Sequence, residues 1–196
     1  DASVPGPGGS RQHVRRALVA SLERLGTDVI DLYTYHRPDG ITPLEETLTA
    51  MQELVDEGRV RWLGLSNVDA AQVAAAASSG VTVVAVQNEY SLLHRDDDAE
   101  VLPLCVHHGI GYVPYFPLAS GLLTGKYRRG EPAPAGSRLA GRQIDERDLA
   151  TVEALERVGA ERGRGILELG VGGLASIPGV ASVIAGATSP EQVRAN

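Results

Sequence analysis

The stretch that decides the fold is TPLEETLTAMQELVDEGRVRWLGLSN, residues 42–67. It opens with TPLE, a capping box with proline at the first helical position, and its apolar residues keep a helical spacing until Gly58. Residues 60–65 are rich in strand formers and too few to favour a helix. The stretch therefore predicts a helix followed by a strand, with Ser66 and Asn67 at the strand's end.

The same unit recurs along the chain. We predict further strands at residues 29–36, 81–86, 111–115 and 182–186, with helices at residues 14–25, 69–80, 100–108 and from about 146. Near-continuous apolar strands that alternate with helices are typical of a parallel sheet covered on both faces. Two α/β architectures stay open: a doubly wound sheet, or a (β/α)₈ TIM barrel without its first strands. A full barrel typically needs ~250 residues, so 196 residues fit a barrel present as strands 4–8 with their helices.

The composition is that of an ordinary globular protein, with 43% hydrophobic and 22% charged residues. No apolar run is long enough for a spanning helix, so we expect no membrane partner. A net charge of −7 gives no basic footprint for nucleic acid. The single Cys105 excludes an intramolecular disulfide and a cysteine-rich metal site. With no secretory leader in view, we expect a cytoplasmic location.

No shift in composition divides the chain, so we expect a single domain over residues 1–196. Within it, residues 118–142 are rich in proline and glycine and predict a long loop region that covers a cofactor. Residues 1–9 resemble a loop. At the other end, Ser189 suits a helix N-cap and Pro190 the first helical position. A helix that begins so clearly should continue. We therefore expect that these residues belong to a longer chain, parts of which are missing here at both ends.

Polar side chains stand at or just after the ends of the predicted strands. They are His36, Ser66, Asn67, Gln87, Asn88, Tyr115 and Thr188. The carboxyl ends of parallel strands share one face, where such folds bind ligands. A single serine or asparagine there is more often a helix cap, and His36 alone could be a core histidine. The same placement on five strands favours a ligand site.

Five segments together resemble the aldo-keto reductases. They are residues 25–39, which end soon after His36, and residues 58–67, 86–91, 115–126 and 184–196. The resemblance runs from about residue 10 to residue 196. It implies a (β/α)₈ barrel that binds NADPH or NADP⁺ in extended form across the carboxyl ends of the strands. No Gly-x-Gly-x-x-Gly motif occurs in the chain, which agrees with a dinucleotide site that is not of the Rossmann type.

The resemblance also implies roles for individual residues. Ser66, Asn67 and Gln87 would hydrogen-bond the nicotinamide carboxamide, and Tyr115 would stack on the nicotinamide ring. The pyrophosphate would be lined, mostly by backbone groups, by Phe116, Pro117, Leu118, Ala119 and Ser120. Lys126 and Arg138 would reach phosphates, and the adenosine with its 2′-phosphate would be surrounded by Gly186, Thr188, Gln192 and Asn196. Phe116 departs from the family pattern, because a serine is usual there.

The family reduces carbonyl groups with an Asp, Tyr, Lys and His tetrad, in which the tyrosine is the general acid. Only His36 is present here, because the other three precede the segment that begins at residue 10. Tyr33 and Tyr35 do not match the family's tyrosine by position. We expect His36 to orient a small carbonyl substrate and not to bind a metal.

These features predict an NADPH-dependent reductase of aldehydes or ketones that is catalytically incomplete over residues 1–196. Two alternatives stay open. One is a non-catalytic NADPH-binding scaffold or sensor, as the potassium-channel β-subunits partly are. The other is a pseudoenzyme fragment that folds only in an oligomer, because five strands cannot close an eight-stranded barrel. A homo-oligomer is therefore one expected state.

Overall fold

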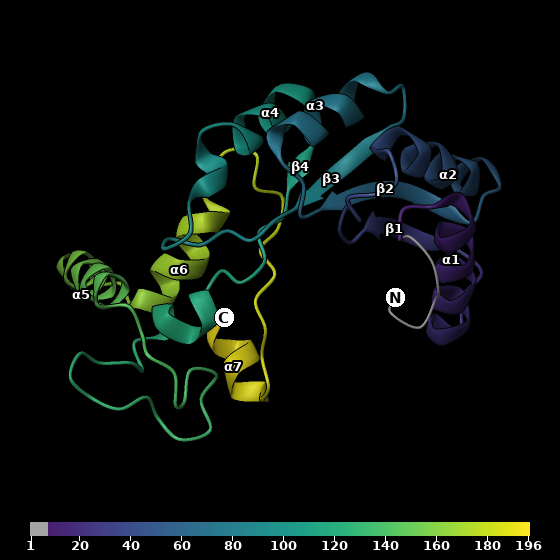
Figure 1. The fold of residues 1–196 in the computed structure, drawn as a ribbon. Coiled ribbons are helices and arrows are strands. Elements are labelled where there is room, and N and C mark those ends of the chain that lie inside the picture. Colours follow the sequence, from purple (N-terminus) through teal and green to yellow (C-terminus); the bar gives the residue numbers. More distant parts are fainter. Residues whose placement is uncertain (1–7) are drawn as a thin grey trace. The chain divides into compact units, whose positions relative to one another are not determined.

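The computed structural model describes residues 8–196, which form two compact units (Figure 1). Of the described residues, the first unit contains 8–88 and 98–112. The second contains residues 89–97 and 113–196. The loop expected at residues 1–9 lies mostly outside the described residues.

A four-stranded parallel sheet forms the centre of the first unit. Its strands are β1 (Ile30–Tyr35), β2 (Val60–Ser66), β3 (Val83–Gln87) and β4 (Gly111–Tyr112). Their spatial order, β1-β2-β3-β4, is also their order along the chain. A doubly wound sheet reverses its strand order at one point, where ligands bind. The order found here has no reversal and is that of a barrel wall.

Four helices accompany this sheet: α1 (Arg11–Leu25), α2 (Leu44–Asp56), α3 (Ala70–Ser78) and α4 (Val101–His108). Each of them contacts the next, and α2, α3 and α4 lie along one side of the strands (Figure 1). Right-handed crossovers between neighbouring parallel strands place successive helices on the same side. The buried residues between helices and sheet include Leu18, Leu48, Leu54, Leu63, Leu65 and Val86.

The two faces of the sheet differ in burial. Leu63 and Leu65 of β2 are 1% and 0% exposed. Trp62, which alternates with them, is 54% exposed, and its register partner Leu32 on β1 is 44% exposed. Because successive side chains of a strand point to opposite faces, the buried set faces the helices. Leu32 and Trp62 lie on the opposite face.

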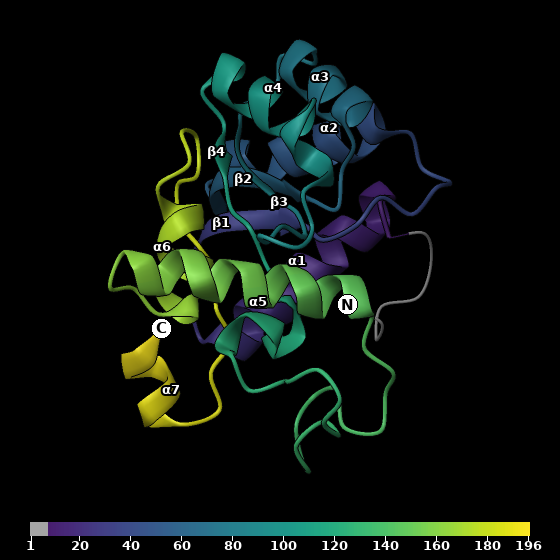
Figure 2. The same ribbon diagram turned by 90° about the vertical axis from the view of Figure 1, so that its left-hand side faces the viewer.

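The second unit is mainly helical. It contains the short 3-10 helix η2 (Ala119–Thr124) and the helices α5 (Glu146–Glu161), α6 (Ile166–Ala175) and α7 (Pro190–Ala195). Its core consists of Leu122, Leu123, Tyr127, Leu149 and Val152. The helices α5 and α6 contact each other and η2 (Figure 2). Residues 125–145, which include most of the loop region predicted at 118–142, contain no helix or strand.

The structure corrects three local predictions. The strand predicted at residues 182–186 is a single bridge, between Ile184 and Tyr115, and the strand predicted at 111–115 ends at Tyr112 before the bridge at Tyr115. The capping box predicted at Thr42 is wrong, because α2 begins after Pro43 and has no side-chain cap. The Thr42 hydroxyl donates instead to Asp39 Oδ2, at 2.9 Å. The cap predicted at Ser189 is confirmed, since its side chain accepts a hydrogen bond from a helical backbone N–H, and Asp69 caps α3 in the same way.

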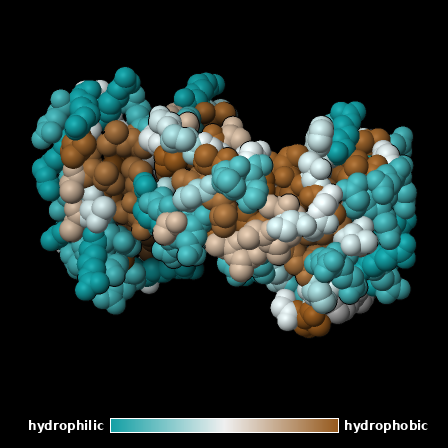
Figure 3. Space-filling model, turned by 90° about the horizontal axis from the view of Figure 1, so that it is seen from above, coloured by the Kyte–Doolittle hydropathy of each residue, from teal (hydrophilic) through white to brown (hydrophobic). Residues whose placement is uncertain are grey.

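Hydrophilic and hydrophobic side chains are interleaved over the face shown in Figure 3. Within residues 8–196, no helix is both long and apolar enough to cross a membrane.

Candidate active site

Three of the predicted site residues lie at the carboxyl ends of adjacent strands. His36 directly follows β1, Ser66 ends β2 and Gln87 ends β3. Ser66 and Gln87 are register partners in the parallel pair of β2 and β3. The predicted gathering of these side chains at one end of the sheet is therefore confirmed for β1, β2 and β3.

Hydrogen bonds join these strand ends into one network. Ser66 Oγ donates to the backbone carbonyl of Gln87 at 2.6 Å, and the Asn67 backbone N–H donates to the same oxygen at 3.1 Å. The Asn67 side-chain amide donates to the His36 carbonyl at 2.8 Å and to Ser66 Oγ at 3.1 Å. Asn67 thus ties the chain after β1 to the end of β2.

The backbone of Asn67 adopts a left-handed conformation, with φ of 56°. Among non-glycine residues, asparagine is one of the few that reach this region at low cost. The left-handed turn directs the chain out of β2 while the side chain turns back toward His36.

This network determines which hydrogen-bonding positions of the Ser66 hydroxyl are already used. Its hydrogen is donated to the Gln87 carbonyl, and one of its lone pairs accepts from Asn67. A hydroxyl has one donor and two acceptor positions, so any further contact of Ser66 must be with a donor. A primary amide N–H, such as that of a nicotinamide carboxamide, fits this requirement.

Asn88 has a role that its position at a strand end did not reveal. Its side chain is 6% exposed, accepts from the Val68 N–H at 3.1 Å and donates to the Val68 carbonyl at 2.7 Å. It therefore fastens the turn after Asn67 to the end of β3. The buried hydrogen bonds to Val68 distinguish the structural Asn88 from Asn67, and these bonds are not visible in the sequence.

The tyrosines of β1 are not placed to donate a proton to a substrate. Tyr33 Oη donates to the carbonyl of Val14 in α1, at 3.3 Å, and burial raises the pKa of Tyr33 to about 12. Burial also raises the pKa of Tyr35, whose oxygen accepts from the Asp39 N–H at 3.1 Å. A general acid works best with a pKa near the working pH, and both shifts go the other way. His36 between strand and loop is exposed.

Tyr115 occupies a junction in the second unit. It forms single bridges with Glu89 and with Ile184, and its ring meets the Phe116 ring edge to face, with centroids 5.2 Å apart. The segments that begin at Tyr115 and at Ile184 are thereby held side by side. Both belong to the predicted cofactor site.

The segment after Tyr115 has an unusual backbone. Phe116, Ala119 and Ser120 have φ values of 55°, 44° and 57°, in the left-handed region that non-glycine residues seldom adopt. Pro117 is buried, and Leu118 lies against Gly170 of α6. The N–H groups of Ala119 and Gly121 donate to carbonyls within the turn, those of Phe116 and Leu118.

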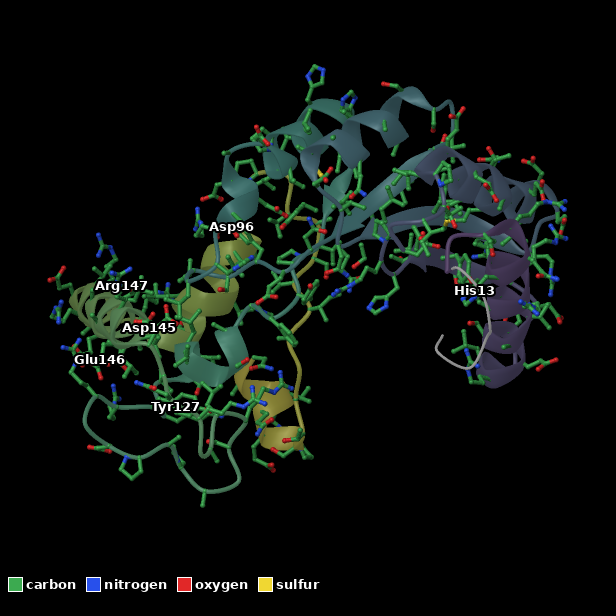
Figure 4. All side chains as sticks on the ribbon, in the orientation of Figure 1. His13, Asp96, Tyr127, Asp145, Glu146 and Arg147 are labelled. Carbon is green, nitrogen blue, oxygen red and sulfur yellow. The ribbon has the colours of Figure 1, made fainter. Side chains whose placement is uncertain are left out.

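Two cations from the loop region lie against this turn. The Lys126 ammonium is so close to Gly121 that a Cβ at Gly121 would lie 2.9 Å from Nζ. The guanidinium of Arg138 lies over the Phe116 ring, 5.4 Å from its centroid. The buried Tyr127 orders the loop, since its hydroxyl accepts from the Leu139 N–H at 3.3 Å (Figure 4). The structure thus gathers both predicted phosphate ligands at one turn.

The four residues predicted around the adenosine also lie together. Gln192 Oε1 accepts from the N–H and the hydroxyl of Thr188, at 2.7 and 3.1 Å. The Asn196 side chain donates to the Gly186 carbonyl at 3.3 Å. These contacts join the first turn and the C-cap of α7 to the segment that precedes the helix. Among residues 8–196, no three His, Cys, Asp or Glu side chains are grouped so that they could hold a metal ion.

The model of the aldo/keto reductase family matches residues 2–196. The chain belongs to this family. It is 38% identical to a probable voltage-gated potassium channel subunit beta of Arabidopsis thaliana, over 98% of the chain and 63% of that relative. It is 36% identical to the NADH-specific methylglyoxal reductase of Escherichia coli, over 95% of the chain and 59% of the relative.

Solved structures of aldo-keto reductases share the fold. The glycerol dehydrogenase AKR11B4 of Gluconobacter oxydans superimposes with a TM-score of 0.84 at 28% identity, over 95% of this chain and 58% of that one. The thermostable aldo-keto reductase Tm1743 gives 0.77 at 30% identity, over 97% and 61%. The predicted (β/α)₈ fold is confirmed. This aldo-keto reductase chain spans about three fifths of the length of these Arabidopsis thaliana and Escherichia coli relatives.

Proposed function

We propose that this aldo-keto reductase chain binds NADPH and serves the reduction of small aldehydes or ketones to alcohols. The observation that carries the proposal is the hydrogen-bond network that joins His36, Ser66, Asn67 and Gln87 at the ends of three adjacent strands. Such strand ends are where barrels place their chemistry. When bound, the nicotinamide supplies a hydride to the carbonyl carbon.

Ser66, Asn67 and Gln87 are proposed to hold the carboxamide of the cofactor. The Ser66 hydroxyl has acceptor capacity left for an amide N–H, as its network shows. The side-chain amide of Gln87 carries both a donor and an acceptor and suits a planar carboxamide. Tyr115 is proposed to stack on one face of the ring, which leaves the other face for the substrate.

His36 is proposed to orient the carbonyl oxygen of the substrate. As hydride adds to the carbon, negative charge develops on this oxygen, and a positioned donor stabilises it. Tyr33 is excluded from this task because it donates its hydroxyl proton to Val14. Tyr35 is excluded because it is buried, and burial raises the pKa of both tyrosines. We propose that the family's tyrosine acid lies outside residues 1–196, so that these residues alone are catalytically incomplete.

The phosphates are proposed to lie at the left-handed turn of residues 116–120. Lys126 and Arg138 approach this turn from the loop region, and a phosphate there would meet two cations. We propose that residues 118–142 cover the cofactor, and that Gly186, Thr188, Gln192 and Asn196 surround its adenosine and 2′-phosphate.

The preference for NADPH over NADH can be tested by fluorescence titration with both cofactors. We expect NADPH to bind at least about tenfold more tightly, because charge-assisted hydrogen bonds to the extra phosphate contribute roughly 1.5–3 kcal/mol. Lys126→Ala should weaken NADPH binding. The matched control is Arg129→Ala, a nearby cation that pairs with Glu146 and Glu153 and should leave both affinities unchanged. Equal dissociation constants for NADPH and NADH would contradict the preference.

A second candidate function is a non-catalytic, NADPH-binding subunit of a larger assembly. The observation that favours it is the likeness to relatives named as potassium channel β-subunits, at 38% identity for the Arabidopsis thaliana protein and 34% for that of Schizosaccharomyces pombe. For this candidate, the intact protein would bind NADPH but would not oxidise it with a reactive aldehyde such as 4-nitrobenzaldehyde. For either function we propose one domain, a homo-oligomer, and a cytoplasmic location, which suits the buried thiol Cys105.

A further inference from the structure

We infer that Asp39 is a positioning residue, which holds the chain after β1 so that His36 keeps the orientation needed for carbonyl reduction. This inference rests on the proposed function of His36. It concerns a carboxylate that stands three residues beyond His36 and is reached by hydrogen bonds from two separate segments of the chain.

The Asp39 carboxylate accepts four hydrogen bonds. Oδ1 accepts from the backbone N–H groups of Ile41 at 2.9 Å and Thr42 at 2.7 Å. Oδ2 accepts from the Gly9 N–H at 2.8 Å and the Thr42 hydroxyl at 2.9 Å. Four is the number of lone-pair positions of a carboxylate, so its capacity is filled. Burial opposes the ionisation of Asp39, but the hydrogen bonds from Gly9, Thr42 and Ile41 outweigh it and hold its pKa well below the usual range.

Gly9 is fixed in this arrangement by close contacts on several sides. Its carbonyl accepts from the Thr47 hydroxyl of α2, at 2.9 Å. A Cβ at Gly9 would lie 2.5 Å from Thr47 Oγ1 and 2.7 Å from Tyr35 Oη, which no ordinary side chain could tolerate. Only glycine therefore lets the backbone come near enough to reach Asp39.

His36 lies between two anchors. On one side, the Asn67 side chain donates to the His36 carbonyl, and on the other, the Asp39 N–H donates to the Tyr35 hydroxyl. Arg37 and Pro38 alone separate His36 from Asp39, and the proline ring fixes one further dihedral angle. With so short a link, the backbone of His36 cannot turn without breaking the contacts of Asp39.

A loosened anchor should cost turnover more than cofactor affinity. Reaction between a bound hydride donor and a carbonyl depends on near-attack geometry, and a displacement of about 1 Å can cost ~10²-fold in rate. The contacts of Asp39 involve none of the residues proposed to hold the cofactor. If Asp39 had a merely structural role, its loss would lower the stability of the protein and would not reduce turnover more than cofactor affinity.

The experiment uses Asp39→Asn in the intact protein. The amide keeps the shape but presents an NH₂ group where one carboxylate oxygen accepts two hydrogen bonds. We expect kcat for 4-nitrobenzaldehyde to fall at least about tenfold, while the Kd for NADPH stays within about twofold. The matched control is Asp31→Asn, which changes an exposed carboxylate of β1 that pairs with Arg61, and it should change neither quantity. Gly9→Ala should reproduce the effect of Asp39→Asn by pushing the backbone away from Asp39.

A second measurement keeps the inference separate from the proposed function. The ring C–H signals of His36 in NMR spectra should shift or broaden in Asp39→Asn and Gly9→Ala, and should stay as in the wild type in Asp31→Asn. Unchanged His36 signals, or a kcat within twofold of the wild type, would overturn the inference. If the wild type neither binds NADPH nor reduces the aldehyde, the proposed function fails, and the His36 signals alone decide whether Asp39 positions this side chain.

Discussion

Asn88→Ala should be among the most destabilising polar substitutions in the first unit. The Asn88 side chain is the partner of both the N–H and the carbonyl of Val68, at 3.1 and 2.7 Å, and Val68 is 3% exposed. Truncation to alanine leaves two buried backbone groups without this partner. The lost contacts also include the fastening of the Asn67 turn to the end of β3.

The magnitude follows from the two backbone groups. A buried polar group that loses its partner costs about 1–3 kcal/mol, and water that enters the space left by the side chain offsets part of this. We therefore expect the free energy of unfolding to fall by about 2–4 kcal/mol. At about 2–4 °C per kcal/mol for a chain of this size, the melting temperature should fall by about 4–16 °C.

Urea unfolding monitored by tryptophan fluorescence measures this loss in the relevant unit, since the only tryptophan, Trp62, lies in β2. Asn196→Ala is the matched control, because it removes an exposed side chain with a single 3.3 Å contact and should cost less than about 0.5 kcal/mol. A loss below 0.5 kcal/mol for Asn88→Ala would refute the argument that this side chain fastens the turn.

Three further predictions follow from other contacts. Hydrogen bonds to its charged form hold the pKa of Asp39 below the ordinary value of ~3.9, so the contribution of Asp39 to the free energy of unfolding is complete above that pH and is lost as the pH falls. Below pH ~4, urea titrations should therefore show a smaller loss of stability for Asp39→Asn than for the wild type. Tyr33→Phe should cost about 1 kcal/mol in unfolding experiments, by loss of the bond to Val14, and leave carbonyl reduction unchanged. Residues 1–196 alone should not oxidise NADPH with 4-nitrobenzaldehyde, because a general acid contributes ~10²–10⁴-fold and neither tyrosine of β1 is placed to act as one; robust turnover by a preparation of that mass would show otherwise.

The sequence predicted the alternation of helices and strands well, because apolar periodicity and helix caps are local signals. Gly26 and Gly109 close α1 and α4 in the left-handed conformation, as glycines at helix ends commonly do. The choice between a doubly wound sheet and a barrel was not local. It depended on the spatial order of the strands. The sequence does not contain this order, and the pairing of β1 to β4 in the structure reveals it.

The failures were at positions where tertiary contacts compete with local ones. The Thr42 hydroxyl was expected to cap α2, but Asp39 accepts its hydrogen bond together with that of the Thr42 N–H. The gathering of His36, Ser66 and Gln87 could be predicted, because parallel strands end at one edge of a sheet. Their hydrogen bonds, and the different roles of Asn67 and Asn88, could not be predicted, since they depend on which backbone groups are buried nearby.

The left-handed residues after Tyr115 were also beyond prediction, and they bear on function. Phe116, Ala119 and Ser120 are not glycines, yet all three have positive φ, at a cost of about 1–3 kcal/mol for each strained residue. Contacts of the surrounding residues offset this conformational cost: Leu122 and Leu123 pack in the core of the second unit, and Tyr127 accepts a hydrogen bond from the loop. A turn held in this conformation keeps its backbone in place before a ligand arrives, so that binding need not order it. Together with Lys126 and Arg138, which lie beside it, the strained turn is proposed to be a preformed binding site for phosphate.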